Sequence, residues 1–148
     1  MDRKRIVITG LGGLSALGVS ADQIWQSMKA GRPGIGEITT TPLHDLKLRI
    51  GAEVKVLPER GLDPRRIQTM DRFSLLAVLA ALEAVENAGL VIDATNAARV
   101  GAIIGAGVSG FTAIEEAYRS VLIDGRSRAP ILTVPKVMTG APAGQVSM

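Results

Sequence analysis

Two kinds of hydrophobic pattern alternate along the chain. Short runs rich in β-branched residues at 5–9 and 99–104 each lead into glycines, which predicts buried strands followed by tight loops. Apolar residues recur at helical spacing between Ser20 and Gly31, over 70–87 and over 111–122. This order of strand, helix, strand and helix predicts a parallel sheet covered by helices.

The predicted helices carry recognisable start and stop signals. Ser20 stands three residues before Gln23, as in a capping box, and Gly31 follows the last periodic residue. Gly89 occupies the position of a C-terminal cap for the helix over 70–87. That helix is apolar on nearly every side, so we expect it to be buried as the middle layer of a layered α/β fold.

Two proline-containing stretches give weaker patterns. From 32 to 64 the sequence predicts a surface excursion around one strand pair, with a strand at 49–56. The stretch 130–148 holds prolines and small residues and stops without a capping or stop signal. We therefore expect the sequence to be cut short rather than finished at its last residue.

Composition fits one soluble domain and narrows the available chemistry. The 148 residues are 47% hydrophobic and 21% charged, with no cysteine and one histidine, His44. Thiol nucleophiles, disulfides and cysteine- or histidine-based metal clusters are thereby excluded, and His44 reads as a loop histidine. No apolar run approaches the roughly 20 residues of a membrane span, and we expect a cytoplasmic protein. The net charge is only +3, and the four aromatic residues are not interleaved with basic ones as in a nucleic-acid-binding surface.

The glycine loop after the second predicted strand matches a nucleotide-binding pattern. Gly105, Gly107 and Gly110 give G-x-G-x-x-G between a predicted strand and a predicted helix, where a pyrophosphate could approach the helix N-terminus. The pattern also requires an acidic residue at the end of the next strand, and Asp124 instead falls where a helix ends. A dinucleotide-binding module therefore remains an alternative supported by the glycines alone, since such residues often serve packing.

Several segments together resemble a known family. The likeness is carried by the runs 6–15, 30–35, 99–107 and 114–116, with Trp25, Met70-Asp71 and Ala88-Gly89. These residues resemble the β-ketoacyl-[acyl-carrier-protein] synthases, most of all the type II enzyme that elongates fatty acids. The resemblance covers essentially the whole chain in order. It implies the first half of a thiolase-like fold with α-β-α-β-α layers, in a protein that works as a homodimer.

The resemblance also implies a reaction whose central residues are absent from 1–148. Such enzymes use a cysteine nucleophile, two histidines and a lysine to join an acyl chain to malonyl-carrier protein by decarboxylative condensation, without an external cofactor or metal. We expect the cysteine soon after Met148 and the other residues in the second half, so the chain alone should be inactive. The alternative is a chain-length-factor-like partner, which lacks the cysteine and only shapes the pocket of an active mate. The residue at the nucleophile position separates the two.

The resemblance carries binding residues over to this chain. Gly107, Val108 and Phe111 match positions that line the acyl-chain pocket, although Val108 and Phe111 could equally be ordinary core residues. Val108 replaces a position often held by isoleucine, which implies a slightly roomier channel. Ile131 and Leu132 match a stretch that reaches across the dimer interface to the neighbour's pocket.

A basic patch is implied for docking of the acidic acyl carrier protein. Arg65 and Arg66 stand in that patch, whereas Gln68 and Thr69 occupy positions that are commonly basic in relatives. Exposed charges of this kind mainly steer encounter with the partner. The alternative is that the two arginines only solvate the start of a helix.

Overall fold

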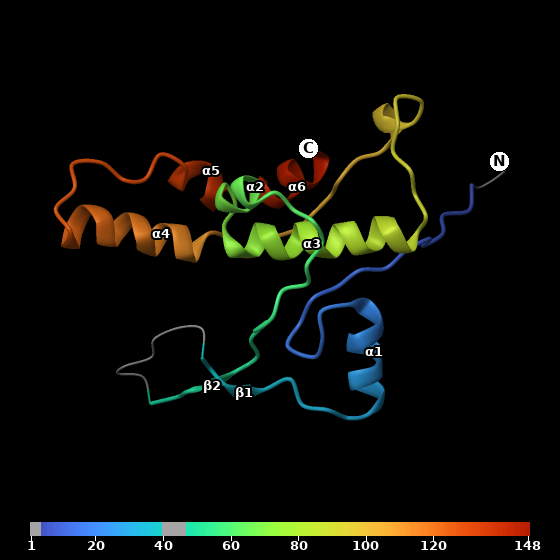
Figure 1. Ribbon diagram of the computed structural model, residues 1–148, viewed down its shortest axis with the longest axis horizontal. Coiled ribbons are helices and arrows are strands. Elements are labelled where there is room, and N and C mark those ends of the chain that lie inside the picture. Colours follow the sequence, from blue (N-terminus) through green and yellow to red (C-terminus); the bar gives the residue numbers. More distant parts are fainter. Residues whose placement is uncertain (1–3, 40–46) are drawn as a thin grey trace. The chain divides into compact units, whose positions relative to one another are not determined.

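Helices make up most of the regular structure in the computed structural model, which describes residues 4–39 and 47–148. His44 lies outside the described residues. In chain order (Figure 1) the elements are α1 (Ala21–Lys29), β1 (Gly36–Glu37), β2 (Ile50–Gly51), α2 (Pro64–Gln68), α3 (Arg72–Asn87), the 3-10 turn η1 (Ala97–Arg99), α4 (Phe111–Tyr118), the π-helical turn η2 (Arg119–Ile123), α5 (Thr133–Val137) and α6 (Ala141–Ser147).

The chain divides into two compact units. The first comprises Met1–Arg60 and Leu79–Val91, and the second comprises Gly61–Val78 and Ile92–Met148. Helix α3 thus contributes its first residues to the second unit and its later residues to the first.

The signals read at the ends of α1 are confirmed. Ser20 is its N-cap, and the Ser20 Oγ accepts a hydrogen bond from the Gln23 backbone N–H at 3.2 Å. The Gln23 side chain returns a bond by accepting from the Val19 N–H at 3.0 Å. After the helix, Gly31 adopts a φ of 64°, and the Arg32 N–H reaches the Ser27 carbonyl at 3.0 Å. This is a Schellman ending, which satisfies carbonyls that the helix leaves free.

Helix α3 confirms the strongest helix prediction and corrects its predicted burial. Gly89 has a φ of 59°, and the Leu90 N–H bonds the Val85 carbonyl at 3.1 Å, so the helix ends as expected. Val78 and Leu79 are buried, but Leu82 is exposed. The helix is therefore covered along part of its surface rather than on all sides.

In the first unit, a glycine loop lies directly against α3. A Cβ atom added to Gly12 would overlap the Ala80 carbonyl oxygen and come within 2.7 Å of the Ala84 N. One added to Gly10 would likewise overlap the Ala84 carbonyl and lie 2.7 Å from the Ala88 N. The loop therefore packs on a stripe of small residues spaced four apart on one helix face, where no side chain fits.

Glu83 on α3 secures this packing through hydrogen bonds. Its carboxylate accepts from the Gly13 N–H at 2.9 Å and from the Ala21 N–H, in the first turn of α1, at 2.9 Å. The Arg60 guanidinium lies 3.9 Å from the same carboxylate. One acidic side chain thus holds the glycine loop, the start of α1 and Arg60 in one arrangement.

The predicted parallel sheet is wrong for the described residues. Segments 5–9 and 99–104 contain no assigned strand, and the described sheet is the antiparallel pair β1–β2, with Gly36 opposite Gly51. Ile6 is 97% exposed, and Ile103 is fully exposed. A strand exists only where its backbone bonds a neighbouring strand, and neither segment has such a neighbour among the described residues. The apolar pattern favours a strand in each segment, but it does not supply the neighbouring strand.

A local turn also displaces the start of the second predicted strand. Asp93 accepts hydrogen bonds from the Thr95 hydroxyl at 2.6 Å and from the Thr95 N–H at 2.8 Å. These bonds, led by the one from the hydroxyl, lower the pKa of Asp93 below its ordinary value. The turn leads into η1, so Arg99 closes a 3-10 turn instead of opening a strand.

The weaker stretches contain more structure than the sequence pattern predicted. The excursion over 32–64 does hold one strand pair, but β2 covers only two residues of the predicted strand 49–56. The helix predicted over 111–122 begins as expected and changes to π-helical bonding at Arg119. The stretch 130–148 forms α5 and α6, which the sequence pattern did not predict because each spans at most seven residues.

The close approach of the glycine loop to α3 can be tested by adding one methyl group. We expect Gly12→Ala to lower the free energy of unfolding by about 1–3 kcal/mol, because the new Cβ overlaps helix backbone that cannot yield. Gly36→Ala is the matched control, since nothing lies within 4 Å of a Cβ there. Thermal or denaturant unfolding of both variants measures the difference, and equal stabilities would contradict the packing.

Candidate functional site

In the second unit, the glycine loop before α4 is tied down at two successive residues. The Ser109 Oγ donates to the Val137 carbonyl at 2.7 Å. Gly110 is buried with a φ of 66°, and a Cβ there would lie 2.5 Å from the Val137 Cα. Only glycine combines this left-handed conformation with such close packing. The loop is therefore fixed against the end of α5.

A buried carboxylate holds the other side of the same segment. Asp71, which is 6% exposed, precedes α3, and its Oδ1 lies 3.4 Å from the Phe73 N–H. Its Oδ2 accepts from the Ala113 N–H, in the first turn of α4, at 2.9 Å. Asp71 thus bridges the N-terminal turns of α3 and α4, where free N–H groups and the helix dipole favour negative charge.

The predicted acyl-pocket residues lie on this anchored segment and point away from the core. Val108 is 65% exposed and Phe111 is 70% exposed, while Gly107 is exposed with open space around it. The alternative that Val108 and Phe111 are core residues does not hold within this chain. Two exposed apolar side chains are therefore carried on a backbone that is anchored at Ser109, Gly110 and Ala113.

Ile131 and Leu132 belong to the same unit, just before α5. Leu132 is the N-cap position of α5, and the Pro130 carbonyl accepts from the Thr133 N–H at 3.0 Å. Ile131 is almost fully exposed, and Leu132 is less so. Because α5 packs against α4, this turn is connected through one short helix to the segment that carries Val108 and Phe111. No direct contact joins the two pairs of side chains in the interactions described.

The two predicted docking arginines differ in their surroundings. Both lie in α2, where the Asp63 carboxylate caps the helix by accepting from the Arg65 N–H at 2.8 Å. The Arg65 side chain is exposed, whereas Arg66 is half-buried and donates to the Gln145 carbonyl in α6. A crevice of about 380 Å³ lies beside them, lined by Arg65, Arg66, Thr69, Gln145 and Met148. Arg66 therefore joins two helices, and Arg65 alone is free to meet a partner.

The nucleotide-binding alternative loses its physical basis at the start of α4. The fingerprint places a pyrophosphate at the N-terminus of the helix that follows a strand. Here 101–106 is not a strand, and the Ala113 N–H is already taken by the Asp71 carboxylate. A second anion at this position would meet a fixed negative charge, so Gly105, Gly107 and Gly110 do not form a pyrophosphate cradle.

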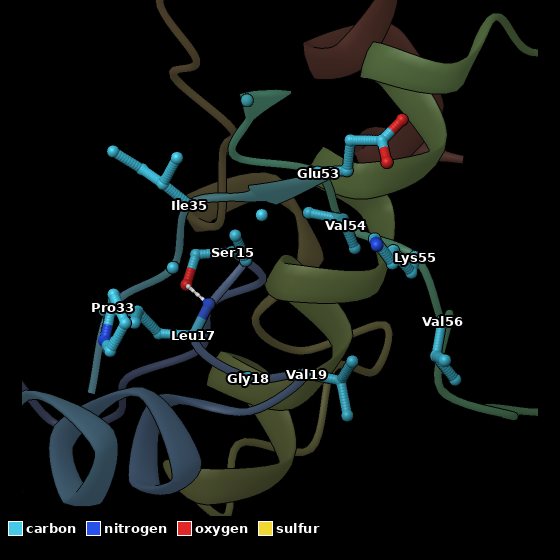
Figure 2. Close-up of a pocket in the computed structure, with 14 residues that line it drawn as sticks. Ser15, Leu17, Gly18, Val19, Pro33, Ile35, Glu53, Val54, Lys55 and Val56 are labelled. Atoms are coloured by element: carbon cyan, nitrogen blue, oxygen red, sulfur yellow. Dashed lines mark hydrogen bonds between the residues drawn. The ribbon is translucent and has the colours of Figure 1, made fainter. Parts of the chain in front are cut away.

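The first unit contains a crevice that sequence analysis did not single out. It measures about 320 Å³, and Figure 2 shows Ser15 and Leu17 on one side with Val54 and Lys55 facing them. Its polar groups are engaged in holding the chain, because the Ser15 Oγ accepts from the Leu17 N–H and the Lys55 Nζ donates to the Glu37 carbonyl. No predicted site residue lines it.

Sequence reasoning missed the role of Asp71. An aspartate directly before a helical pattern is a recognisable N-cap signal, so its bond toward α3 could have been predicted. Its bond to Ala113, 42 positions away, has no sequence signal.

Among the described residues, no group of three or more His, Asp or Glu side chains is placed to hold a metal ion. No described helix is both long and apolar enough to cross a membrane.

Comparison with known proteins identifies relatives over the whole chain. The family model of the beta-ketoacyl synthase N-terminal domain matches residues 3–148. Nodulation protein E of Rhizobium sp. (strain N33) is 57% identical over 100% of this chain and 37% of its own length. The 3-oxoacyl-[acyl-carrier-protein] synthase 2 of Synechocystis sp. is 35% identical over 97% of this chain and 35% of its own length. The chain thus spans little more than a third of either relative.

Solved structures confirm the expected fold class. The crystal structure of a beta-ketoacyl synthase from Burkholderia phymatum STM815 matches with a TM-score of 0.76 and 28% identity, covering 98% of this chain and 36% of that one. The backbone thus follows the N-terminal portion of a thiolase-like α/β fold, although 5–9 and 99–104 pair with no strand among the described residues. From the family model and these structural matches together, the chain belongs to the beta-ketoacyl synthase family.

Proposed function

We propose that the complete protein is a 3-oxoacyl-[acyl-carrier-protein] synthase that extends acyl chains by two carbons in fatty-acid biosynthesis. It acts in the cytoplasm on acyl and malonyl thioesters and needs no external cofactor. The 35% identity to a synthase with this name supports the choice. Because the chain spans 37% of the Rhizobium relative, the reaction is proposed for the complete protein rather than for these 148 residues.

One observation carries the proposal within this chain: two apolar side chains stand exposed on a backbone that is fixed on both sides. Val108 lies two residues before Gly110 and Phe111 directly after it; Gly110 is buried against Val137, and Asp71 holds the turn that follows. An exposed loop of apolar residues is normally mobile, whereas a binding wall must be apolar and rigid. These properties suit a surface that receives an acyl tail.

The proposed chemistry divides between this chain and the rest of the protein. The thiolate of a cysteine beyond Met148 attacks the carrier thioester, takes over the acyl group and releases the carrier's thiol. Malonyl-carrier protein loses CO₂, and the resulting enolate attacks the acyl carbonyl and expels the cysteine thiolate. Two histidines and a lysine outside this chain support the charge that develops. Gly107, Val108 and Phe111 hold the acyl tail and limit its length.

Arg65 is the stronger candidate for contact with acidic carrier protein. It is exposed, whereas the Arg66 guanidinium is committed to the Gln145 carbonyl. An exposed cation accelerates encounter with an acidic partner and adds little to the final affinity. We therefore assign steering mainly to Arg65 and joining of α2 to α6 mainly to Arg66.

Ile131 and Leu132 are proposed as the wall that one protomer of a homodimer lends to its neighbour's pocket. Ile131 is almost fully exposed beside the start of α5, although a branched apolar side chain gains free energy from burial. An interface covering this turn would remove that cost. The same interface would bring it near a second copy of the acyl surface.

Condensation by the complete protein tests the function directly. With carrier-bound acyl donor and malonyl-carrier protein, we expect CO₂ release and a product two carbons longer, detected by mass spectrometry. A chain-length-factor-like partner would give neither alone and would carry a residue other than cysteine at the nucleophile position. Failure to condense despite that cysteine would contradict the proposal.

Nodulation is a second candidate for the process that the condensation serves. The 57% identity to Nodulation protein E exceeds the 35% identity to the synthase. Deletion of the gene distinguishes the two processes. Loss of nodulation with unchanged growth and bulk fatty acids would assign the protein to nodulation. Impaired growth would assign it to fatty-acid biosynthesis.

Val108 should limit the length of the acyl chain. In the complete protein, Val108→Phe fills space beside the tail, so we expect the longest accepted donor to become shorter. Each methylene excluded changes discrimination by about 1–3 kcal/mol. Val56→Phe is a matched control, because Val56 is 67% exposed and lies in the first unit. An unchanged product profile for Val108→Phe would remove Val108 from the channel.

Arg65 should control the rate of encounter with carrier protein. We expect Arg65→Glu to slow acylation by carrier-bound donor, most strongly at low salt, and to spare a small thioester mimic. Lys29→Glu makes the same change in charge at an exposed site on α1 and should leave both rates near wild type. Equal losses with carrier-bound and small donors would instead indicate a folding defect.

A further inference from the structure

Asp71 does more than cap its own helix. Its carboxylate is 6% exposed and is shared between two segments far apart in sequence, through the Phe73 N–H and the Ala113 N–H. The contact with Ala113 is shorter, at 2.9 Å, than the contact with Phe73, at 3.4 Å. The geometry therefore favours the bond to α4 over the local cap.

Helix α4 has no cap of its own to replace Asp71. Its N-cap residue is Gly110, which has no side chain to accept from the first-turn N–H groups. A buried helix start without an acceptor is unfavourable, and a negative charge at this point also complements the helix dipole. Asp71 supplies both from outside the helix.

The residues that Asp71 fixes are interleaved with those proposed to touch the acyl tail. Ser109, Gly110 and Ala113 are anchored, while Val108 and Phe111 stand between or beside them with exposed side chains. Releasing Ala113 would free the first turn of α4 to shift, and both apolar side chains would move with it.

We propose that Asp71 is a positioning residue for acyl-chain length: by holding the first turn of α4 it fixes the pocket surface formed by Val108 and Phe111. This inference rests on the proposed function. A purely structural cap would affect all donors equally. A positioning role predicts a loss that depends on chain length, because long donors reach furthest along the surface.

Asp71→Ser separates the two roles. Serine is a good N-cap, and Ser20 performs that task in α1 through a 3.2 Å bond. The shorter side chain with a single oxygen can keep the cap on α3 but cannot also reach Ala113. Asp63→Ser is the matched control, since the Asp63 carboxylate accepts from the Arg65 N–H within its own helix.

The experiment uses the complete protein and small acyl thioesters of increasing length, with malonyl-carrier protein in excess. For Asp71→Ser we expect the ratio of kcat/KM between the longest and shortest accepted donors to fall about tenfold. We also expect faster amide hydrogen exchange over 108–113. Asp63→Ser should leave both the ratio and this exchange as in wild type.

A wild-type ratio and wild-type exchange in Asp71→Ser would overturn the inference, as would a uniform loss for all donors. If the wild-type protein condenses no donor, the proposed function fails together with the specificity role, and exchange alone then decides whether Asp71 holds α4. If Asp71→Ser does not fold, Asp71→Asn serves instead, because its single carbonyl oxygen matches only one of the two N–H groups.

Discussion

The first turns of helices α1 and α4 each donate a backbone N–H to a carboxylate, which belongs to Glu83 on α3 in the first case and to Asp71, directly before α3, in the second. A helix start exposes N–H groups that need acceptors, and a negative charge there also meets the positive end of the dipole. In the first unit Glu83 accepts from the Ala21 N–H, and in the second unit Asp71 accepts from the Ala113 N–H. Losing Glu83 would leave part-buried N–H groups unpaired, and losing Asp71 would leave the buried Ala113 N–H unpaired, which costs more than losing a surface contact. The positions of α1 and α4 within their units depend on these two side chains.

The glycine-rich loops look alike in sequence, but their glycines have different structural roles. Gly10 and Gly12 permit backbone to lie on α3, and Gly110 combines a left-handed conformation with close packing on Val137. Gly105 and Gly107, in contrast, have open space around them. A glycine pattern therefore signals that side chains are excluded or unnecessary, but it does not say whether a ligand or the protein itself takes the space.

The apolar residues that this chain leaves exposed fall into two groups with different physical surroundings. Val108 and Phe111 are presented by a loop with buried anchors, while Ile6 and Ile103 lie on segments that pair with no strand among residues 4–39 and 47–148. The two situations differ physically. The backbone that carries the first pair is anchored within its own unit through Ser109, Gly110 and Ala113. The second pair lacks the hydrogen-bonded neighbours that would make a strand, and the relatives are nearly three times as long as this chain.

Local signals were sufficient for the helices and for their ends. Ser20 with Gln23, Gly31 and Gly89 act through neighbours within a few residues, so the start of α1 and the ends of α1 and α3 were predictable. Family resemblance was predictable too, because it depends on residue order. The apolar runs at 5–9 and 99–104 predict strands, yet a strand is a property of two segments and the pattern describes only one.

The candidate site shows the same division. The sequence by itself determined which residues are apolar, glycine or charged at 105–113, and it determined the family. Only the tertiary structure decided that Val108 and Phe111 are exposed, that Arg66 is committed to Gln145 while Arg65 is free, and that Asp71 reaches Ala113. These outcomes depend on contacts between residues tens of positions apart, and such contacts leave no periodic trace in the sequence because each is made by a single pair.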